Sequence, residues 1–119
     1  MKLAAIFPGQ GAQSVGMLAD IAEAHASVKA KFDVASQVLG FDLWSMVQEG
    51  PAEVLGSTEN TQPALLVASV ALWELWSAGS EKVNVMAGHS LGEYSALVCA
   101  GAMSFEDGVR LVRTRGELM

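Results

Sequence analysis

The pentapeptide G-H-S-L-G at residues 88–92 constrains the fold of this chain more than any other segment. Residues 82–87 before it are mostly apolar and predict a short strand, whereas residues 93–100 after it predict a helix. A serine on a tight strand-to-helix turn has an exposed hydroxyl, and the first amides of the helix point at the group it attacks. Glycines on both sides let the turn close without a Cβ clash. The pattern therefore predicts that Ser90 is a nucleophile.

The remaining elements alternate in kind along the chain. An apolar strand is expected at residues 3–7, followed by a Pro-Gly-Gln-Gly loop. Helices are expected from about Val15, over 27–39 with Gly40 as the end, from Asp42 through Val47, over 51–55, over 62–77 with Thr61 or Asn60 as the cap, and from Ser104 to the last residue. This order predicts an α/β fold with a short parallel sheet covered by helices, as part of an α/β-hydrolase-like core.

Two features predict that residues 1–119 are the N-terminal portion of a larger α/β domain. Only two strands are evident, and parallel sheets are normally wider and covered on both faces. The final residues, 115–119, contain no glycine cap, proline stop or polar tail. We therefore expect the domain to be truncated within or just after its last helix.

Charge and composition exclude several classes of function. The net charge of −6 and the pI near 4.7 argue against a nucleic-acid partner, which favours a basic face. No apolar run reaches the roughly 18 residues of a membrane span, and no secretory leader is evident. The single cysteine, Cys99, excludes an internal disulfide, suits a reducing cytoplasm and is expected to be an inert core thiol. No metal site is expected.

A nucleophilic serine needs a base, and the chain contains two histidines. His89 adjoins Ser90, and neighbouring side chains on a sharp turn diverge, so His89 is expected to line the pocket or brace the turn instead. His25 ends an early polar helix and is expected at the surface. Either the base lies beyond residue 119, or Ser90 is not activated.

The last helix carries one arginine on the face that is expected to be buried. Its exposed stripe is charged, and Arg115 falls on the opposite, apolar stripe. The charged stripe consists of Glu106, Arg110, Arg113 and Glu117, and the apolar stripe of Gly108, Leu111, Val112, Arg115 and Met119. A buried guanidinium must be paired, so Arg115 is expected either to form a structural ion pair or to bind a substrate carboxylate.

Two glutamines leave similar alternatives. Gln10 is either an ordinary turn residue or, through its backbone amide and that of Leu91, part of an oxyanion hole. Gln62 is either a cap at the start of the long apolar helix or a residue that lines the pocket. Three tryptophans are expected to anchor the core or an interface: Trp44, Trp73 and Trp76.

Four segments together resemble the N-terminal half of malonyl-CoA:acyl-carrier-protein transacylases of fatty acid and polyketide synthesis. They are F-P-G-Q-G-A-Q at 7–13, T-Q-P-A-L at 61–65, G-H-S-L-G-E-Y-S-A at 88–96 and R-T-R-G at 113–116. The resemblance implies that Ser90 carries the acyl group, that the amides of Gln10 and Leu91 hold the oxyanion, and that Arg115 binds the malonyl carboxylate. It further implies malonyl-CoA and acyl carrier protein as partners, with coenzyme A thioester as substrate and no permanently bound cofactor.

The chain also departs from that family. The resemblance places the catalytic histidine downstream, after a ferredoxin-like subdomain, and neither occurs in these 119 residues. The isolated chain is therefore expected to be inactive or weakly active, and its preference between malonyl and methylmalonyl is not determined. Two alternatives stay open: a serine esterase or thioesterase of α/β-hydrolase type, and an inactive fragment that self-associates through its exposed core.

Overall fold

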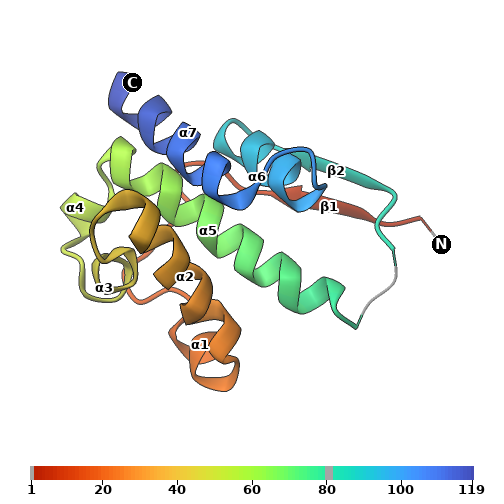
Figure 1. Cartoon of the computed structure of the whole chain (residues 1–119), viewed down its shortest axis with the longest axis horizontal. Coiled ribbons are helices and arrows are strands. Elements are labelled where there is room, and N and C mark those ends of the chain that lie inside the picture. Colours follow the sequence, from red (N-terminus) through yellow and green to blue (C-terminus); the bar gives the residue numbers. More distant parts are fainter. Residues whose placement is uncertain (1, 80–81) are drawn as a thin grey trace.

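Two short parallel strands form the sheet in the computed structural model, which describes residues 2–79 and 82–119 (Figure 1). Strand β1 is Ala4–Phe7 and strand β2 is Val85–Gly88, with Ala4 opposite Val85 and Phe7 opposite Gly88. The Oδ1 atom of Asn84 accepts a hydrogen bond from the Leu3 amide (2.9 Å) just before the paired residues. The predicted short parallel sheet in a mixed α/β fold is confirmed.

Seven helices make up most of the rest of the described part of the chain. They are α1 (Ala19–Ala24), α2 (Ala26–Leu39), α3 (Leu43–Glu49), α4 (Ala52–Leu55), α5 (Thr58–Ser77), α6 (Leu91–Cys99) and α7 (Phe105–Leu118). Side chains cap two of them as their sequences predict: Asp42 accepts from the Ser45 amide (3.0 Å) and Ser104 from the Asp107 amide (3.2 Å). Gly40 ends α2 in the left-handed conformation, as expected.

The predicted start of the long helix was wrong. Helix α5 begins at Thr58, with Ser57 as N-cap, and neither Asn60 nor Thr61 caps it. The Thr61 hydroxyl instead donates to the Ser57 carbonyl within the helix (3.0 Å). Pro63 lies inside α5 and leaves the Glu59 carbonyl without its helical donor, and this carbonyl accepts a hydrogen bond from Arg113 (2.9 Å).

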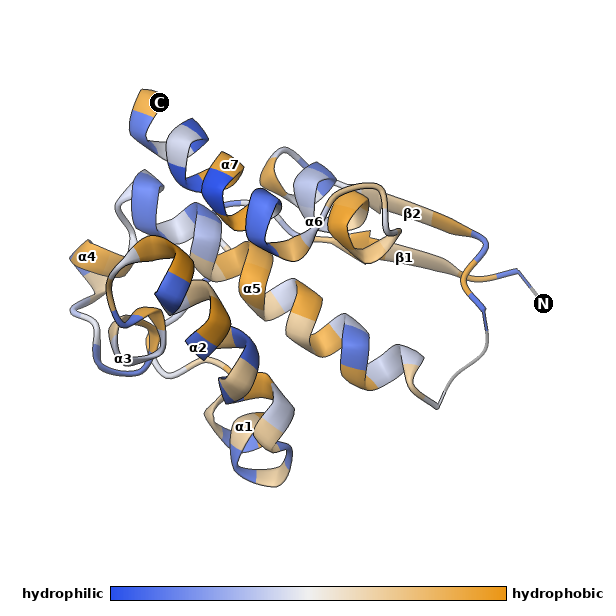
Figure 2. Cartoon of the chain, viewed as in Figure 1, coloured by the Kyte–Doolittle hydropathy of each residue, from blue (hydrophilic) through white to orange (hydrophobic). Residues whose placement is uncertain are grey.

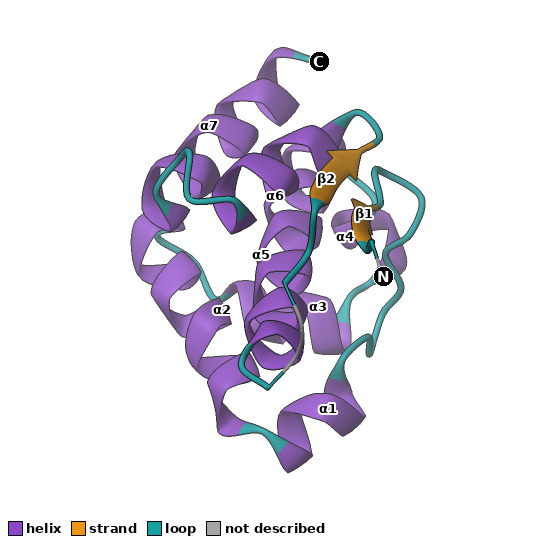
Figure 3. Cartoon of the chain, turned by 90° about the vertical axis from the view of Figure 1, so that its right-hand side faces the viewer, coloured by secondary structure: helices purple, strands orange, loops and turns teal. Residues whose placement is uncertain are grey.

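Helix α5 forms the centre of the molecule, and residues 61–71 are all buried. It packs against α2, α6 and α7 (Figure 1). Figure 3 shows both strands on one side of the helical layer. The opposite face of the sheet is open: Ile6 is 78% and Val85 is 60% exposed, and both strands are apolar (Figure 2). The core between the helices is well packed, whereas the outer face of the sheet is apolar and exposed.

The buried face of α7 differs from the predicted stripe. Gly108 and Val112 are buried as expected, but Leu111 and Met119 are exposed. Arg113 was expected on the exposed stripe and is half-buried against α5. Periodicity alone misplaced this face, because α7 packs on α5 through Phe105, Gly108, Val109, Val112 and Gly116.

The tryptophans play different parts. The Trp44 ring meets Phe32 edge to face in the core, with 5.1 Å between ring centroids. The rings of Trp73 and Trp76 on α5 are tilted by 32° with 5.5 Å between their centroids, and Trp76 is 45% exposed. Among the described residues, no helix is both long and apolar enough to cross a membrane.

Candidate functional site

Ser90 lies at the sharp turn between β2 and α6. Its backbone has φ 57° and ψ −112°, and its side chain is exposed. An L-residue in this region is strained by about 1–3 kcal/mol, and such strain is concentrated at functional positions. Helix α6 starts at the next residue, Leu91, two positions earlier than the predicted boundary. The strand–turn–helix context of Ser90 is confirmed.

Glycines bring the two strands and the turn into backbone contact. A Cβ on Gly92 would overlap the carbonyl oxygen of Phe7, and a Cβ on Gly88 would overlap the backbone of Gly92. Gly9 approaches the carbonyl of His89 in the same way, at 2.5 Å from an added Cβ. The loop after β1, which carries Gln10, is therefore held against the Ser90 turn. Sequence reasoning missed the role of Gly9, although its Pro-Gly-Gln-Gly loop was a signal for it.

Two backbone amides near Ser90 are candidates to hold an oxyanion. The Leu91 amide is at the first position of α6, where helical amides lack partners within the helix. The Gln10 amide lies in the apposed loop, and the Gln10 side chain donates to Thr58 Oγ1 at 3.3 Å. Within the described residues, neither amide donates to another protein group. Both are therefore available for an anionic oxygen.

Arg115 reaches from α7 to the Ser90 turn. Its Nη2 donates to Ser90 Oγ (3.2 Å), its Nη1 donates to Gln62 Oε1 (2.8 Å), and its guanidinium lies 5.3 Å from the centre of the Tyr94 ring. No carboxylate in the described part of the chain forms a salt bridge with it. The ion-pair alternative thus has no partner there. Sequence reasoning missed Tyr94, which follows Ser90 by four residues, about one helical turn.

Gln62 is not a helix cap. It is 1% exposed on α5, well inside a helix that starts at Thr58, and its Oε1 accepts from Arg115. Its Nε2 donates to the sulfur of Met119 (3.1 Å). A buried amide with both ends engaged has a fixed orientation, so Gln62 aims the guanidinium of Arg115 toward Ser90.

Neither histidine hydrogen-bonds to Ser90. His89 is exposed on the turn, and His25 is exposed at the junction of α1 and α2, far from α6 (Figure 1). Among the described residues, Arg115 is the one side chain that hydrogen-bonds to Ser90 Oγ. The described residues also contain no group of three metal-ligating side chains. Among the described residues, no histidine is therefore hydrogen-bonded to Ser90 Oγ as a general base would be.

Cys99 ends α6 and is half-buried against the core. Burial raises the pKa of its thiol to about 12, the Glu74 carboxylate adds to this increase, and Lys31 opposes it. A thiol with so high a pKa is protonated at neutral pH and is a weak nucleophile. This agrees with the expectation that Cys99 is inert.

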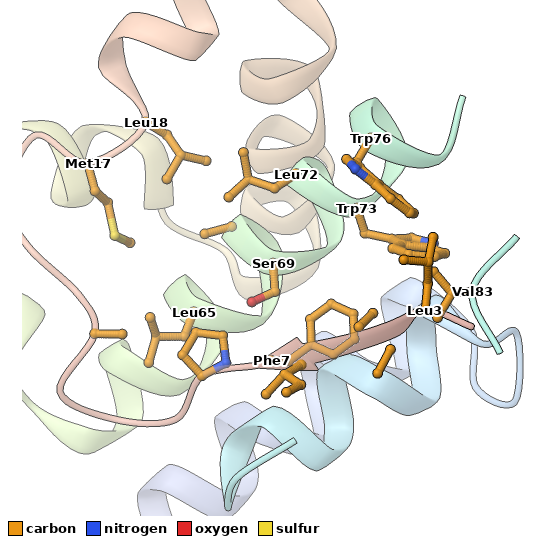
Figure 4. Close-up of a pocket in the computed structure, with 16 residues that line it drawn as sticks. Leu3, Phe7, Met17, Leu18, Leu65, Ser69, Leu72, Trp73, Trp76 and Val83 are labelled. Atoms are coloured by element: carbon orange, nitrogen blue, oxygen red, sulfur yellow. The ribbon is translucent and has the colours of Figure 1, made fainter. Parts of the chain in front are cut away.

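A large apolar hollow lies away from Ser90. It has a volume of about 550 Å³ and opens between β1 and α5, where Phe7, Leu65 and Trp73 line it (Figure 4). Neither Ser90 nor Arg115 contributes to its wall. Ser90 and Arg115 instead meet just beyond the carboxyl end of β2, and ligands of open α/β sheets bind at such strand ends.

Comparisons with a family model and with individual proteins agree on one family. The acyl transferase domain family matches residues 5–119. The malonyl CoA-acyl carrier protein transacylase of Salmonella typhimurium is 58% identical, and that of Escherichia coli K12 is 57% identical, each over 119 residues. These alignments cover 99% of this chain and 38% of each relative, so the chain spans well under half of their length.

Solved structures agree with the sequence comparison. An acyl carrier protein S-malonyltransferase from Vibrio cholerae superimposes with a TM-score of 0.97 at 60% identity, over 100% of this chain and 39% of that one. A malonyl-transacylase solved in complex with its type II polyketide synthase acyl-carrier protein gives a TM-score of 0.97 at 56% identity, over 99% of this chain and 38% of that one. The chain belongs to the acyl transferase domain family.

Proposed function

We propose that this chain provides the acyl-accepting half of a malonyl-CoA:acyl-carrier-protein transacylase of fatty acid synthesis. The observation that carries the proposal is the position of Arg115, whose guanidinium joins Ser90 Oγ to the buried amide of Gln62. A cation beside a nucleophile suits an acyl group that carries its own carboxylate. The names of the relatives point to the same substrate and partner.

The proposed reaction has two steps and forms one covalent intermediate. Ser90 Oγ attacks the thioester carbonyl of malonyl-CoA, and its proton passes to a base that these residues do not supply. The oxyanion accepts hydrogen bonds from the amides of Gln10 and Leu91. The C–S bond then breaks, and coenzyme A leaves as its thiol with a seryl ester behind. The phosphopantetheine thiol of acyl carrier protein attacks that ester, a new C–S bond forms as the C–O bond to Ser90 breaks, and the thiol proton passes through the base to the serine oxygen, which leaves malonyl on the carrier protein.

Arg115 would provide selectivity for a dicarboxylic acyl group. Malonyl presents a carboxylate that can accept two parallel hydrogen bonds from the guanidinium, whereas acetyl offers the guanidinium no anionic partner. A site built to bind a polar group rejects an analogue that lacks it, because the binding group then stays desolvated without a partner.

The missing base should slow acylation of the isolated chain by about 10²–10⁴-fold.

Three further properties of the protein belong with this reaction: its fold, its location and its cofactor requirement. We infer an α/β-hydrolase-like core, a cytoplasmic location, and coenzyme A thioester as a substrate in place of any permanently bound cofactor. The esterase alternative is not favoured, because a simple ester has no carboxylate for the guanidinium that contacts Ser90. An inactive self-associating fragment would not be acylated, whereas an acyltransferase would.

The test is the intact mass of the chain after incubation with malonyl-CoA, with and without added imidazole as an external base. We expect one malonyl increment that grows faster with imidazole and is absent from a Ser90→Ala variant. Ser95→Ala is a matched control, since Ser95 is buried on α6 and should leave the increment unchanged. No increment under either condition, or an equal increment in the Ser90→Ala variant, would contradict the proposal.

A further inference from the structure

Arg113 is buried to a degree that its predicted place on a charged stripe does not explain. Its Nη1 donates to the Glu59 carbonyl (2.9 Å) and to Asn60 Oδ1 (2.7 Å). Its guanidinium also lies over Phe41, 5.1 Å from the ring centre. Its ion pair with Glu117 is long (3.8 Å) and involves an exposed carboxylate. The main partners of Arg113 are therefore on the first turn of α5.

The Glu59 carbonyl needs a donor because of Pro63. In an α-helix the carbonyl of residue 59 accepts from the amide of residue 63, and proline has no amide hydrogen. A part-buried carbonyl without a partner destabilises the structure. Arg113 supplies the missing hydrogen bond from α7. The interruption in α5 is thereby converted into an attachment point for α7.

The two helices also touch through their backbones at this level. A Cβ on Gly116 would lie 2.6 Å from Glu59 Cα and 2.7 Å from the Thr58 carbonyl oxygen. Gly116 therefore sets how closely α7 approaches α5. The hydrogen bonds of Arg113 add a directional constraint to this close contact.

Arg113 and Arg115 attach α7 to α5 within one helical turn. Arg113 contacts residues 59 and 60, and Arg115 contacts Gln62. A shift of α7 along α5 would therefore carry the Arg115 guanidinium away from Gln62 and Ser90. Functional side chains require this kind of support, because an error of about 1 Å in position can cost 10²-fold in rate.

We propose that Arg113 is a positioning residue that holds Arg115 in place for carboxylate recognition, by satisfying the Glu59 carbonyl that Pro63 leaves free. The functional consequence rests on the proposed role of Arg115, whereas the positioning itself does not. The two parts can therefore fail separately.

The first test is the side-chain Nε–Hε NMR spectrum, in which the three arginines of the chain give three assignable signals. In the parent chain, we expect the Arg115 signal to be shifted and protected from solvent exchange. Arg113→Met keeps the aliphatic stem and should move the Arg115 signal to the position of a free guanidinium. Arg113→Lys should retain most of the shift, because an ammonium can donate to both oxygens. Arg110→Met is the matched control, since Arg110 pairs with exposed Asp107.

A double variant tests the cause. Pro63→Ala restores an amide hydrogen for the Glu59 carbonyl, so Arg113→Met should displace the Arg115 signal much less when it is combined with Pro63→Ala. This comparison also covers the case in which Arg113→Met weakens folding, because the double variant recovers the lost hydrogen bond. An Arg115 signal unchanged by Arg113→Met, or displaced equally with and without Pro63→Ala, would overturn the proposal.

The functional arm compares the rates of Ser90 acylation by malonyl-CoA and acetyl-CoA. Arg113→Met should lower the malonyl rate about tenfold or more and leave the acetyl rate nearly unchanged, because only malonyl uses Arg115. Equal losses for both substrates would indicate general damage and contradict the inference. If the parent chain is not acylated at all, the proposed function fails, and the NMR comparison still decides the positioning.

Discussion

At the residue scale, Ser90 and Arg115 lie 25 positions apart in the sequence and are hydrogen-bonded in the structure. Each residue has a feature that lowers stability. Ser90 is in a strained conformation (φ 57°), and Arg115 is half-buried without a carboxylate partner in the described residues. Sequence alone could predict that both are special. The motif at 88–92 indicated the strained turn, and the apolar stripe indicated the unusual arginine. It could not predict their 3.2 Å contact, which depends on packing between α6 and α7.

Strain at Ser90 gives a stability prediction. Glycine adopts positive φ without a Cβ clash, although it also gives the unfolded chain more freedom. We therefore expect Ser90→Gly to be more stable than Ser90→Ala by about 1 kcal/mol in the free energy of unfolding. Urea titration followed by tryptophan fluorescence measures the difference. A Ser90→Gly variant that is less stable than Ser90→Ala would show that the turn is not strained.

Cys99 gives a prediction about reactivity and pH. Its pKa is raised to about 12 from 9.0, so its thiolate population at pH 8 should be about 1000-fold below that of an unperturbed thiol. Alkylation by iodoacetamide should be slow at pH 8, should keep rising with pH beyond 9, and should reach the rate of a free thiol in urea. Mass spectrometry follows the reaction. Equal rates in the native and the unfolded chain would contradict the burial effect.

At the scale of elements, the sequence predicted kinds of element better than their contacts. Both strands and all the main helices were evident from local patterns such as the Asp42 and Ser104 caps. The start of α5 was not, because Pro63 lies inside the helix and the Glu59 carbonyl one turn earlier accepts from Arg113, a residue distant in sequence. The buried face of α7 was misplaced for a similar reason. Long-range partners decide such details, and local periodicity does not contain them.

The contact between β1 and α6 gives a prediction for Gly92. Gly92→Ala places a methyl group on the Phe7 carbonyl, which cannot move because it is part of the sheet. We expect a loss of about 1–3 kcal/mol or more in the free energy of unfolding, together with displacement of Ser90. Gly79→Ala is the control, because none of the described residues lies within 4 Å of its added Cβ. Equal stability of the two variants in urea titration would contradict the close approach.

At the scale of the whole molecule, the sheet has only two strands in the described residues, and one of its faces is exposed to solvent. The sequence predicted a sheet of only two strands, and the structure leaves Ile6 and Val85 exposed on its open face. Apolar faces with free strand edges favour association between copies. The rest of the relatives' length is not represented in this chain, so its sequence cannot predict how that face is covered.

The open face predicts concentration-dependent association of the isolated chain. Val85→Lys places a charge on that face and should shift the sedimentation profile toward monomer. Leu118→Lys, at the exposed end of α7, is the matched control and should leave association unchanged. Association that persists equally in both variants would place the contact elsewhere on the molecule.

The most direct measurement of the central claim is the ratio of Ser90 acylation rates with malonyl-CoA and acetyl-CoA, before and after Arg115→Met. The substitution keeps the aliphatic stem and removes the guanidinium that contacts Ser90 and Gln62. We predict that the ratio falls roughly 10- to 100-fold, the value of charged hydrogen bonds to a carboxylate, mainly through the malonyl rate. An unchanged ratio would contradict the assignment of Arg115 as the carboxylate-binding residue.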